Sequence, residues 1–267
     1  MKKKLASFVF AAVLAAGLAA EDFSLSAGVE ALLGYTFTRY TLESEGSMSA
    51  GDPGDIKSLQ SMDRFNYGGG LFFDATYAEF TILLQGGQNS YGETMDFKPR
   101  GKPWAGVSND LGTGTETLLG FTLLGKYPFA VTEKLSLFPL VGIEYQVALR
   151  EWRKPKGDKV YDRTGGILAA DMDKNGDPYP LSAWNSFWID IGAGVDYYIW
   201  GPFFLRAEVL FGFRLMTEYE TGALEMTKAQ FNSPDPKLVG LTGGPNVRIS
   251  AGYKFFSGGK WVKPVVH

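Results

Sequence analysis

A regular alternation of apolar and polar residues constrains this chain more than any other feature of its sequence. From Phe23 to Phe37 the odd positions read Phe, Leu, Ala, Val, Ala, Leu, Tyr and Phe, and nearly all the positions between them are small or polar. A period of two over fifteen residues predicts a β-strand with one apolar and one polar face. The mean strand of a soluble protein has about 5–6 residues, so this strand is unusually long.

The same pattern recurs seven more times along the chain. The predicted strands are 65–77, 79–88, 117–129, 135–149, 187–197, 203–215 and 247–255. Short turns near Ala78, 131–134 and 198–202 alternate with long polar connections at 41–64, 89–116, 150–186 and 216–246. Short turns at one end and long loops at the other predict an up-and-down meander. All the strands follow one pattern, so we expect a single all-β domain over 21–256, with a C-terminal tail at 257–267.

The N-terminus has the layout of a secretory signal peptide. Lys2, Lys3 and Lys4 precede an apolar stretch that ends at Ala19 and Ala20. The stretch is shorter than the ~20 residues of a membrane-spanning helix. We therefore predict an exported protein with a cleaved signal at 1–20.

The distribution of charge favours a barrel that spans a membrane over a soluble ligand-binding barrel. The apolar face is almost free of charge, whereas the polar face carries many glycines and twelve charged residues: Glu30, Asp74, Glu79, Lys126, Glu144, Asp190, Asp196, Arg206, Glu208, Arg214, Arg248 and Lys254. Glycines weaken a solvent-facing strand, but in a narrow lumen they leave room for long neighbours. The sequence therefore predicts an antiparallel eight-stranded transmembrane β-barrel with its apolar face toward lipid.

Aromatic residues on the apolar face support the membrane interpretation. They fall at strand ends beside the short turns: Phe23, Tyr77, Phe80, Tyr127, Phe129, Tyr197, Phe203 and Tyr253. Such a belt is typical of one membrane–water interface.

With its signal sequence, eight amphipathic strands and last strand "NVRISAGYKF", the chain resembles small eight-stranded bacterial outer-membrane proteins, the OmpA transmembrane domain, OmpX and OmpW-like group. The resemblance implies an outer-membrane location, periplasmic short turns, four surface loops, and insertion by the barrel-assembly machinery. One departure is the run of eleven residues after Phe256, because members of this group often end on the aromatic of the last strand.

Composition argues against several functions. The chain has no Cys, one His at position 267 and a net charge of −3. A catalytic Ser needs a positioned base, and His267 follows the last strand, so we do not expect an enzyme. A mildly acidic chain is also a poor nucleic-acid binder, and we expect no cofactor and a monomer.

The lumen allows two interpretations. Seven acids and five bases point inward by parity, and an eight-stranded barrel is only wide enough for its own side chains. We therefore favour a self-neutralising plug, in which Arg206, Arg214 and Arg248 pair with Glu30, Glu144 and Glu208. The alternative is an OmpW-like narrow passage for small hydrophobic solutes, suggested by inward apolar residues: Leu32, Phe72, Leu83, Leu118 and Leu124.

Two of the long connections carry basic and aromatic residues. These are Lys98, Arg100, Lys102 and Trp104 in the second connection, and Trp152, Arg153, Lys154 and Lys156 in the third. At the outer surface they are suited to lipid phosphates, host surfaces or acidic polysaccharides; solvated loops with packed Trp side chains are the simpler interpretation.

The segment "DMDKNGD" resembles half of a calcium loop, with side-chain oxygens at Asp171, Asp173, Asn175 and Asp177. An EF-hand loop also needs a bidentate acid at its twelfth position, which is Ser182 here. We therefore favour an Asp/Asn/Gly turn, with weak Ca²⁺ binding as the alternative.

Overall fold

A computed structural model describes residues 25–47, 53–99, 105–155, 161–162, 182, 185–215 and 237–258. The predicted signal peptide lies outside this part of the chain. Eight long strands make up the fold: β1 (Leu25–Ser47), β2 (Pro53–Asp74), β3 (Ala78–Pro99), β4 (Ala105–Lys126), β6 (Leu135–Pro155), β8 (Ser186–Trp200), β9 (Phe203–Arg214) and β10 (Lys237–Gly258). Two short strands, β5 (Phe129–Ala130) and β7 (Tyr161–Asp162), pair with β6. No helix among the described residues is long and apolar enough to cross a membrane.

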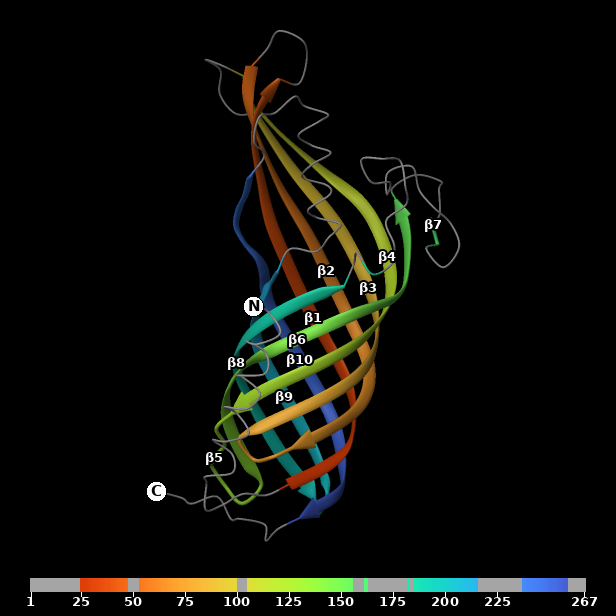
Figure 1. The fold of residues 1–267 in the computed structure, drawn as a ribbon, viewed down its shortest axis with the longest axis vertical. Coiled ribbons are helices and arrows are strands. Elements are labelled where there is room, and N and C mark those ends of the chain that lie inside the picture. Colours follow the sequence, from red (N-terminus) through yellow and green to blue (C-terminus); the bar gives the residue numbers. More distant parts are fainter. Residues whose placement is uncertain are drawn as a thin grey trace.

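The eight long strands form a closed antiparallel barrel (Figure 1). Each strand pairs with its neighbour in the chain, β1 pairs with β10, and the circle is completed by β4 with β6. This order confirms the predicted all-β, up-and-down barrel of eight strands. Pairing of Leu25 with Gly258 extends β10 two residues into the predicted tail.

Side chains alternate between the interior and the outer surface as the sequence predicts. In β9, every second residue from Phe204 to Leu210 is buried, while the residues between them are exposed. Exposed positions include Val209 at 60% and Ile249 at 58% of their full accessibility. Aliphatic side chains so exposed on a closed barrel are suited to contact with lipid, so the fold and its surface define the class of a transmembrane β-barrel.

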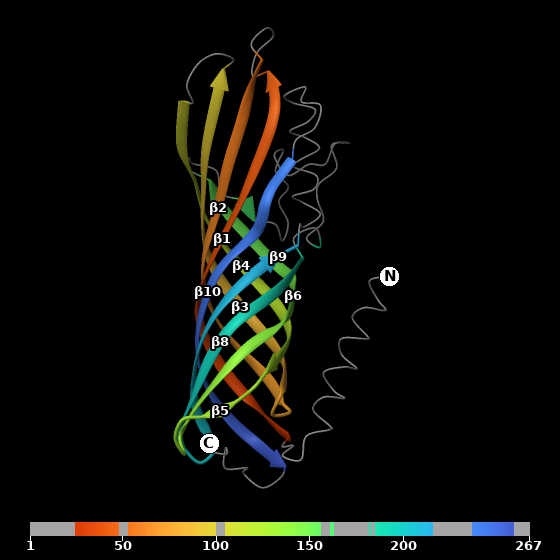
Figure 2. The ribbon, with the colours of Figure 1, turned by 90° about the vertical axis from the view of Figure 1, so that its left-hand side faces the viewer.

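The short turns lie together at one end of the barrel (Figure 2). Between β2 and β3, the Ala75 amide donates to the Ala78 carbonyl at 2.7 Å, and Thr76 adopts a positive φ of 58°. Between β8 and β9, Gly201 takes a φ of 48°, which glycine adopts without steric cost. Between β5 and β6, the Thr132 hydroxyl accepts a hydrogen bond from the Leu135 amide at 3.0 Å.

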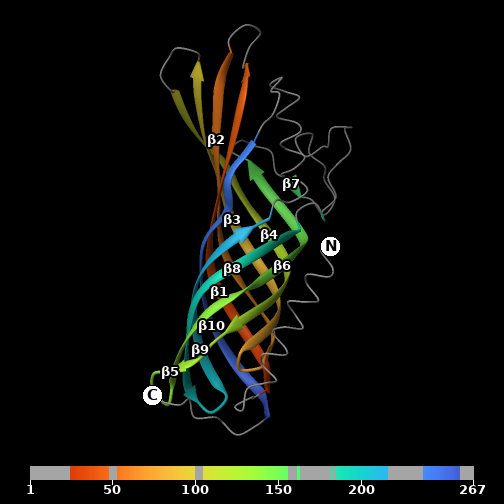
Figure 3. The ribbon, with the colours of Figure 1, turned by 60° about the vertical axis from the view of Figure 1, so that its left-hand side comes forward.

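The strands are longer than the sequence indicated, so the predicted loops at 41–64 and 89–116 are wrong. β1 and β2 stay paired up to Ser47 and Pro53, and β3 and β4 pair up to Phe97 and Ala105. These hairpins rise well beyond β8 and β9 (Figure 3). The prediction relied on alternation of apolar and polar residues, which marks only the part of a strand that faces lipid. Backbone pairing continues further, into segments that are polar on both faces.

Exposed aromatic residues form two groups on the outer surface. Near the turns, Tyr127 contacts Tyr77 and Phe129 at ring-centroid distances of 5.6 and 4.9 Å, and Phe203 contacts Trp200 and Tyr253 at 5.0 and 4.8 Å. A second group lies further along the strands: Tyr35, Phe65, Tyr67, Tyr145 and Phe211. Along β9, Phe203 and Phe211 are eight residues apart, which at about 3.3 Å per residue and a tilt of about 40° spans about 20 Å, close to the height of a lipid-facing band.

Candidate functional site

The structure places most of the inward charges predicted by parity inside the barrel. Nine of the twelve are buried: Asp74, Glu79, Lys126, Glu144, Asp190, Asp196, Arg206, Glu208 and Arg248. The other three, Glu30, Arg214 and Lys254, are half-buried. Apart from Glu30, these residues gather at two levels, one next to the turns and one further along the strands.

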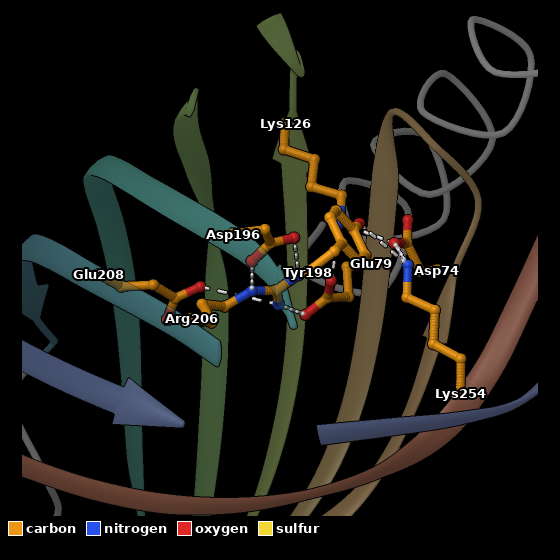
Figure 4. Close-up of polar contacts among 8 residues, drawn as sticks. All are labelled: Asp74, Glu79, Lys126, Asp196, Tyr198, Arg206, Glu208 and Lys254. Carbon is orange, nitrogen blue, oxygen red and sulfur yellow. Dashed lines mark hydrogen bonds and ion pairs between the residues drawn. The ribbon is translucent and has the colours of Figure 1, made fainter. Parts of the chain in front are cut away.

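The level next to the turns is an ion-pair network that we call the lower cluster (Figure 4): Asp74, Glu79, Lys126, Asp196, Tyr198, Arg206, Glu208 and Lys254. Its centre is the Arg206 guanidinium, which donates to both carboxylate oxygens of Asp196, from Nε at 2.7 Å and from Nη2 at 3.0 Å. Nη1 of Arg206 donates to Glu79 Oε1 at 2.5 Å and lies 3.9 Å from Glu208 Oε1.

Two lysines extend the lower cluster toward β2 and β10. Lys126 Nζ lies 2.8 Å from Glu79 Oε2 and 2.9 Å from Asp74 Oδ2. Lys254 Nζ lies 3.6 Å from Asp74 Oδ2 and donates to the Tyr198 hydroxyl at 3.3 Å. Asp74 is the last residue of β2 and Lys126 the last of β4, so the network sits directly above the turns.

The lower cluster crosses the lumen rather than following its wall. In the circular strand order, β3 and β9 stand four places apart in either direction. The bond between Arg206 of β9 and Glu79 of β3 therefore joins opposite sides of the barrel. Buried charges are stable only when paired, and here the pairing itself occupies the centre of the lumen.

A second level, further from the turns, is the upper cluster: Arg64, Glu116, Glu144, Gln146, Trp188, Asp190, Arg214 and Arg248. Arg248 of β10 forms an ion pair with Glu144 of β6, three places away in the circle of strands. Glu144 also accepts a hydrogen bond from Gln146 Nε2 at 2.6 Å. Arg64 of β2 pairs with Glu116 of β4 at 2.6 Å, over Gly87 of the strand β3 that lies between them.

The pairing differs in part from the predicted set of three arginines with three glutamates. Arg248 pairs with Glu144, which are both members of that set, but Arg206 lies closer to Asp196 and Glu79 than to Glu208. The sequence analysis did not identify Arg64 and Glu116, because the predicted strands began at 65 and 117, just after these two residues. Continuing the strand parity by one residue would have found both.

Apolar side chains fill much of the remaining interior. All five predicted inward residues, Leu32, Phe72, Leu83, Leu118 and Leu124, are buried. Leu124 packs in a cluster with Phe138, Leu140 and Leu210. The Arg206 guanidinium lies 5.3 Å from the centroid of the Phe138 ring and 5.4 Å from that of Phe204.

Lumen glycines make room for these large side chains. Four cross-strand pairs set a glycine directly opposite a large apolar residue: Gly28 with Phe72, Gly252 with Phe204, Gly194 with Phe138, and Gly192 with Leu210. A Cβ atom at Gly252 would overlap the Phe204 ring, and one at Gly194 would overlap the Phe138 ring. The glycines thus allow aromatic rings to lie across the lumen and fill it.

The predicted loop and metal residues fall partly outside the described chain. Lys98 belongs to β3, and Trp152, Arg153 and Lys154 belong to β6, so their assignment to loops is wrong; the cause is again strand pairing that continues beyond the apolar pattern. Arg100, Lys102, Trp104, Lys156, Asp171, Asp173, Asn175 and Asp177 lie outside the described residues. Within those residues, no group of three or more His, Cys, Asp or Glu side chains is arranged to hold a metal ion.

Comparisons with known proteins add little beyond the class. No sequence family matches the chain, and no curated protein matches it. Among solved structures, the translocator domain of the autotransporter NalP from Neisseria meningitidis aligns with 13% identity and a TM-score of 0.26, over 95% of this chain and 97% of that one.

Two further solved structures are similarly distant. The outer membrane protease OmpT from Escherichia coli aligns with 10% identity and a TM-score of 0.28, over 85% of this chain and 97% of that one. The β domain of the Bordetella autotransporter BrkA aligns with 11% identity and a TM-score of 0.22, over 86% and 100%. At such scores, nothing about this chain follows from the likeness.

Proposed function

We propose that this chain is a bacterial outer-membrane barrel with a closed lumen, which acts as a structural and surface-interaction protein rather than as a channel. Its apolar outer surface and two aromatic groups support residence in a membrane. The signal-like N-terminus supports export, and among bacterial membranes the outer one houses barrels of this kind.

The observation that carries this proposal is the pair of crossings in the lumen. The Arg206–Glu79 bond joins opposite strands next to the turns, and the Arg248–Glu144 bond joins β10 to β6 further along. Leu124, Phe138 and Leu210 pack in the interior as well. A solute passing through the barrel would have to separate buried ion pairs, which costs several kcal/mol for each.

The partners we propose follow from this arrangement. Lipid surrounds the barrel, and the barrel-assembly machinery inserts it as a monomer. The hairpins β1–β2 and β3–β4 offer the surface for host or polysaccharide ligands. We propose no enzymatic activity and no nucleic-acid binding, because the chain has a single His, after the last strand, and a net charge of −3.

Conductance in planar lipid bilayers tests the closed lumen. We expect the reconstituted wild-type barrel to be silent under an applied voltage. Discrete openings would contradict the plug and favour the narrow passage for hydrophobic solutes. Insertion is verified in the same preparation by the heat-dependent shift in gel mobility of folded barrels, so that silence cannot result from absent protein.

A further inference from the structure

A small cavity lies within the upper cluster. Four charged side chains line it, Arg64 and Arg248 against Glu144 and Asp190, so its charges balance. The space open to a water-sized sphere measures about 10 Å³, which is roughly the room for one water molecule. A cavity of this size and charge is suited to one small neutral molecule that forms hydrogen bonds.

Three polar atoms of the lining residues have no hydrogen-bond partner among the described residues. They are one donor, Arg64 Nε, and two acceptors, Asp190 Oδ2 and Asn246 Oδ1. The three residues are only 4%, 2% and 6% exposed, respectively. A buried polar atom is destabilising unless a further group satisfies it.

The neighbouring groups leave space beside Asp190 rather than pairing with it. Arg64 Nη1 donates to Glu116 at 2.6 Å and to Gln146 at 3.4 Å. Gly212, which pairs with Asp190 across β8 and β9, also lines the cavity. A Cβ atom on this glycine would lie 2.8 Å from Asp190 Oδ1, so any larger residue would crowd the carboxylate.

We propose that this cavity binds one water molecule, which accepts a hydrogen bond from Arg64 Nε and donates to Asp190 Oδ2 and Asn246 Oδ1. Buried water typically makes about three hydrogen bonds to otherwise unsatisfied groups. Water both accepts and donates, as this set of atoms requires. A metal cation could not accept from Arg64 Nε, and an anion without hydrogen could not donate to the two oxygens.

This water joins opposite sides of the barrel. In the circular order, β2 with Arg64 and β8 with Asp190 stand four places apart in either direction. The water therefore gives the upper cluster a crossing between opposite strands, as the bond between Arg206 and Glu79 does in the lower cluster. The site goes beyond the proposed function, because the lower cluster closes the lumen whether or not this water is bound.

Nuclear magnetic resonance of the full-length barrel in detergent micelles tests the site. In a rotating-frame experiment, the hydrogen on Arg64 Nε should show a dipolar cross peak with water, and its sign distinguishes this contact from chemical exchange. Arg64→Lys removes the resonance and so identifies it. The control in the same spectrum is Arg206 Nε, which donates to Asp196 Oδ1 at 2.7 Å and should show no water peak. Absence of the dipolar peak at Arg64 Nε would overturn the proposal.

A second variant locates the water. Asn246→Gln lengthens the side chain by one methylene and brings its amide into the cavity. That amide can accept from Arg64 Nε and donate to Asp190 Oδ2, so the cross peak with water should disappear. Glu133→Gln, in an exposed turn, should keep the peak. Persistence of the peak in folded Asn246→Gln would overturn the assignment, and if this variant does not fold, the wild-type spectrum decides alone.

Discussion

Replacing Glu79 by Gln should destabilise the barrel strongly, because Glu79 joins its two sides. Glu79 is 2% exposed, and its two oxygens contact Arg206 at 2.5 Å and Lys126 at 2.8 Å. Breaking a buried ion pair costs about 3–5 kcal/mol. In this variant Arg206 keeps both hydrogen bonds to Asp196, and Lys126 keeps its ion pair with Asp74. We therefore expect a loss of stability at the lower end of this range, about 3 kcal/mol.

Urea unfolding in lipid vesicles measures this cost, with the fluorescence of the six Trp residues as the signal. At a slope of about 3 kcal/mol per molar urea, the midpoint should fall by about 1 M. The matched control is Glu133→Gln in an exposed turn, which should stay within about 0.5 kcal/mol of wild type. A double-mutant cycle with Arg206→Gln should give a coupling energy within about 0.5–3 kcal/mol, as for residues in contact. A Glu79→Gln midpoint equal to that of Glu133→Gln would mean that water screens this pair, and the plug would be refuted.

Three further predictions concern packing, topology and calcium. Gly28→Ala should lose about 1–3 kcal/mol of stability, because its Cβ would overlap the Tyr253 carbonyl and the Phe72 ring. The control Gly125→Ala should be nearly neutral, since the nearest atom to its Cβ would be Val141 O at 3.5 Å. Equal unfolding midpoints for the two variants would contradict a tightly filled lumen. In intact cells, an antibody to an inserted tag should reach positions 102 and 156 but not the turn at Lys134, and the opposite result would invert the topology. Calcium, if it binds within 171–177, should slow proteolysis of 160–180 without moving the melting temperature, and Asp173→Ala should abolish that protection; equal cleavage in calcium and chelator would leave this segment a turn.

The barrel was predictable from the sequence because lipid imposes a strict period of two on each strand. Residues such as Ile189, Ile191 and Val209 had to point outward, and their neighbours inward. The upper parts of β1–β4 were missed, since no apolar alternation marks a strand that has left the membrane. Boundaries set by the apolar pattern likewise excluded Arg64 and Glu116.

The pairing inside the lumen was less predictable than its composition. Parity assigns Glu79 and Arg206 to the interior, but their contact depends on which strands face each other across the closed barrel. β3 and β9 are far apart in the sequence, and they face each other across the lumen only because eight strands close into a circle. The cavity beside Asp190 depends in the same way on Gly212 and Trp188 from neighbouring positions.

Cysteine accessibility tests the closed lumen most directly, because the chain contains no native Cys. Thr122 is 1% exposed and pairs with Glu144, on the stretch of β4 between Glu116 of the upper cluster and Lys126 of the lower cluster. In folded barrels in detergent, where both ends are open to reagent, a small charged thiol reagent should leave Thr122→Cys unmodified while it rapidly modifies Glu133→Cys in the turn. Unfolding in urea should make both variants react. Modification of Thr122→Cys in the folded barrel at a rate close to that of Glu133→Cys would contradict the closed lumen.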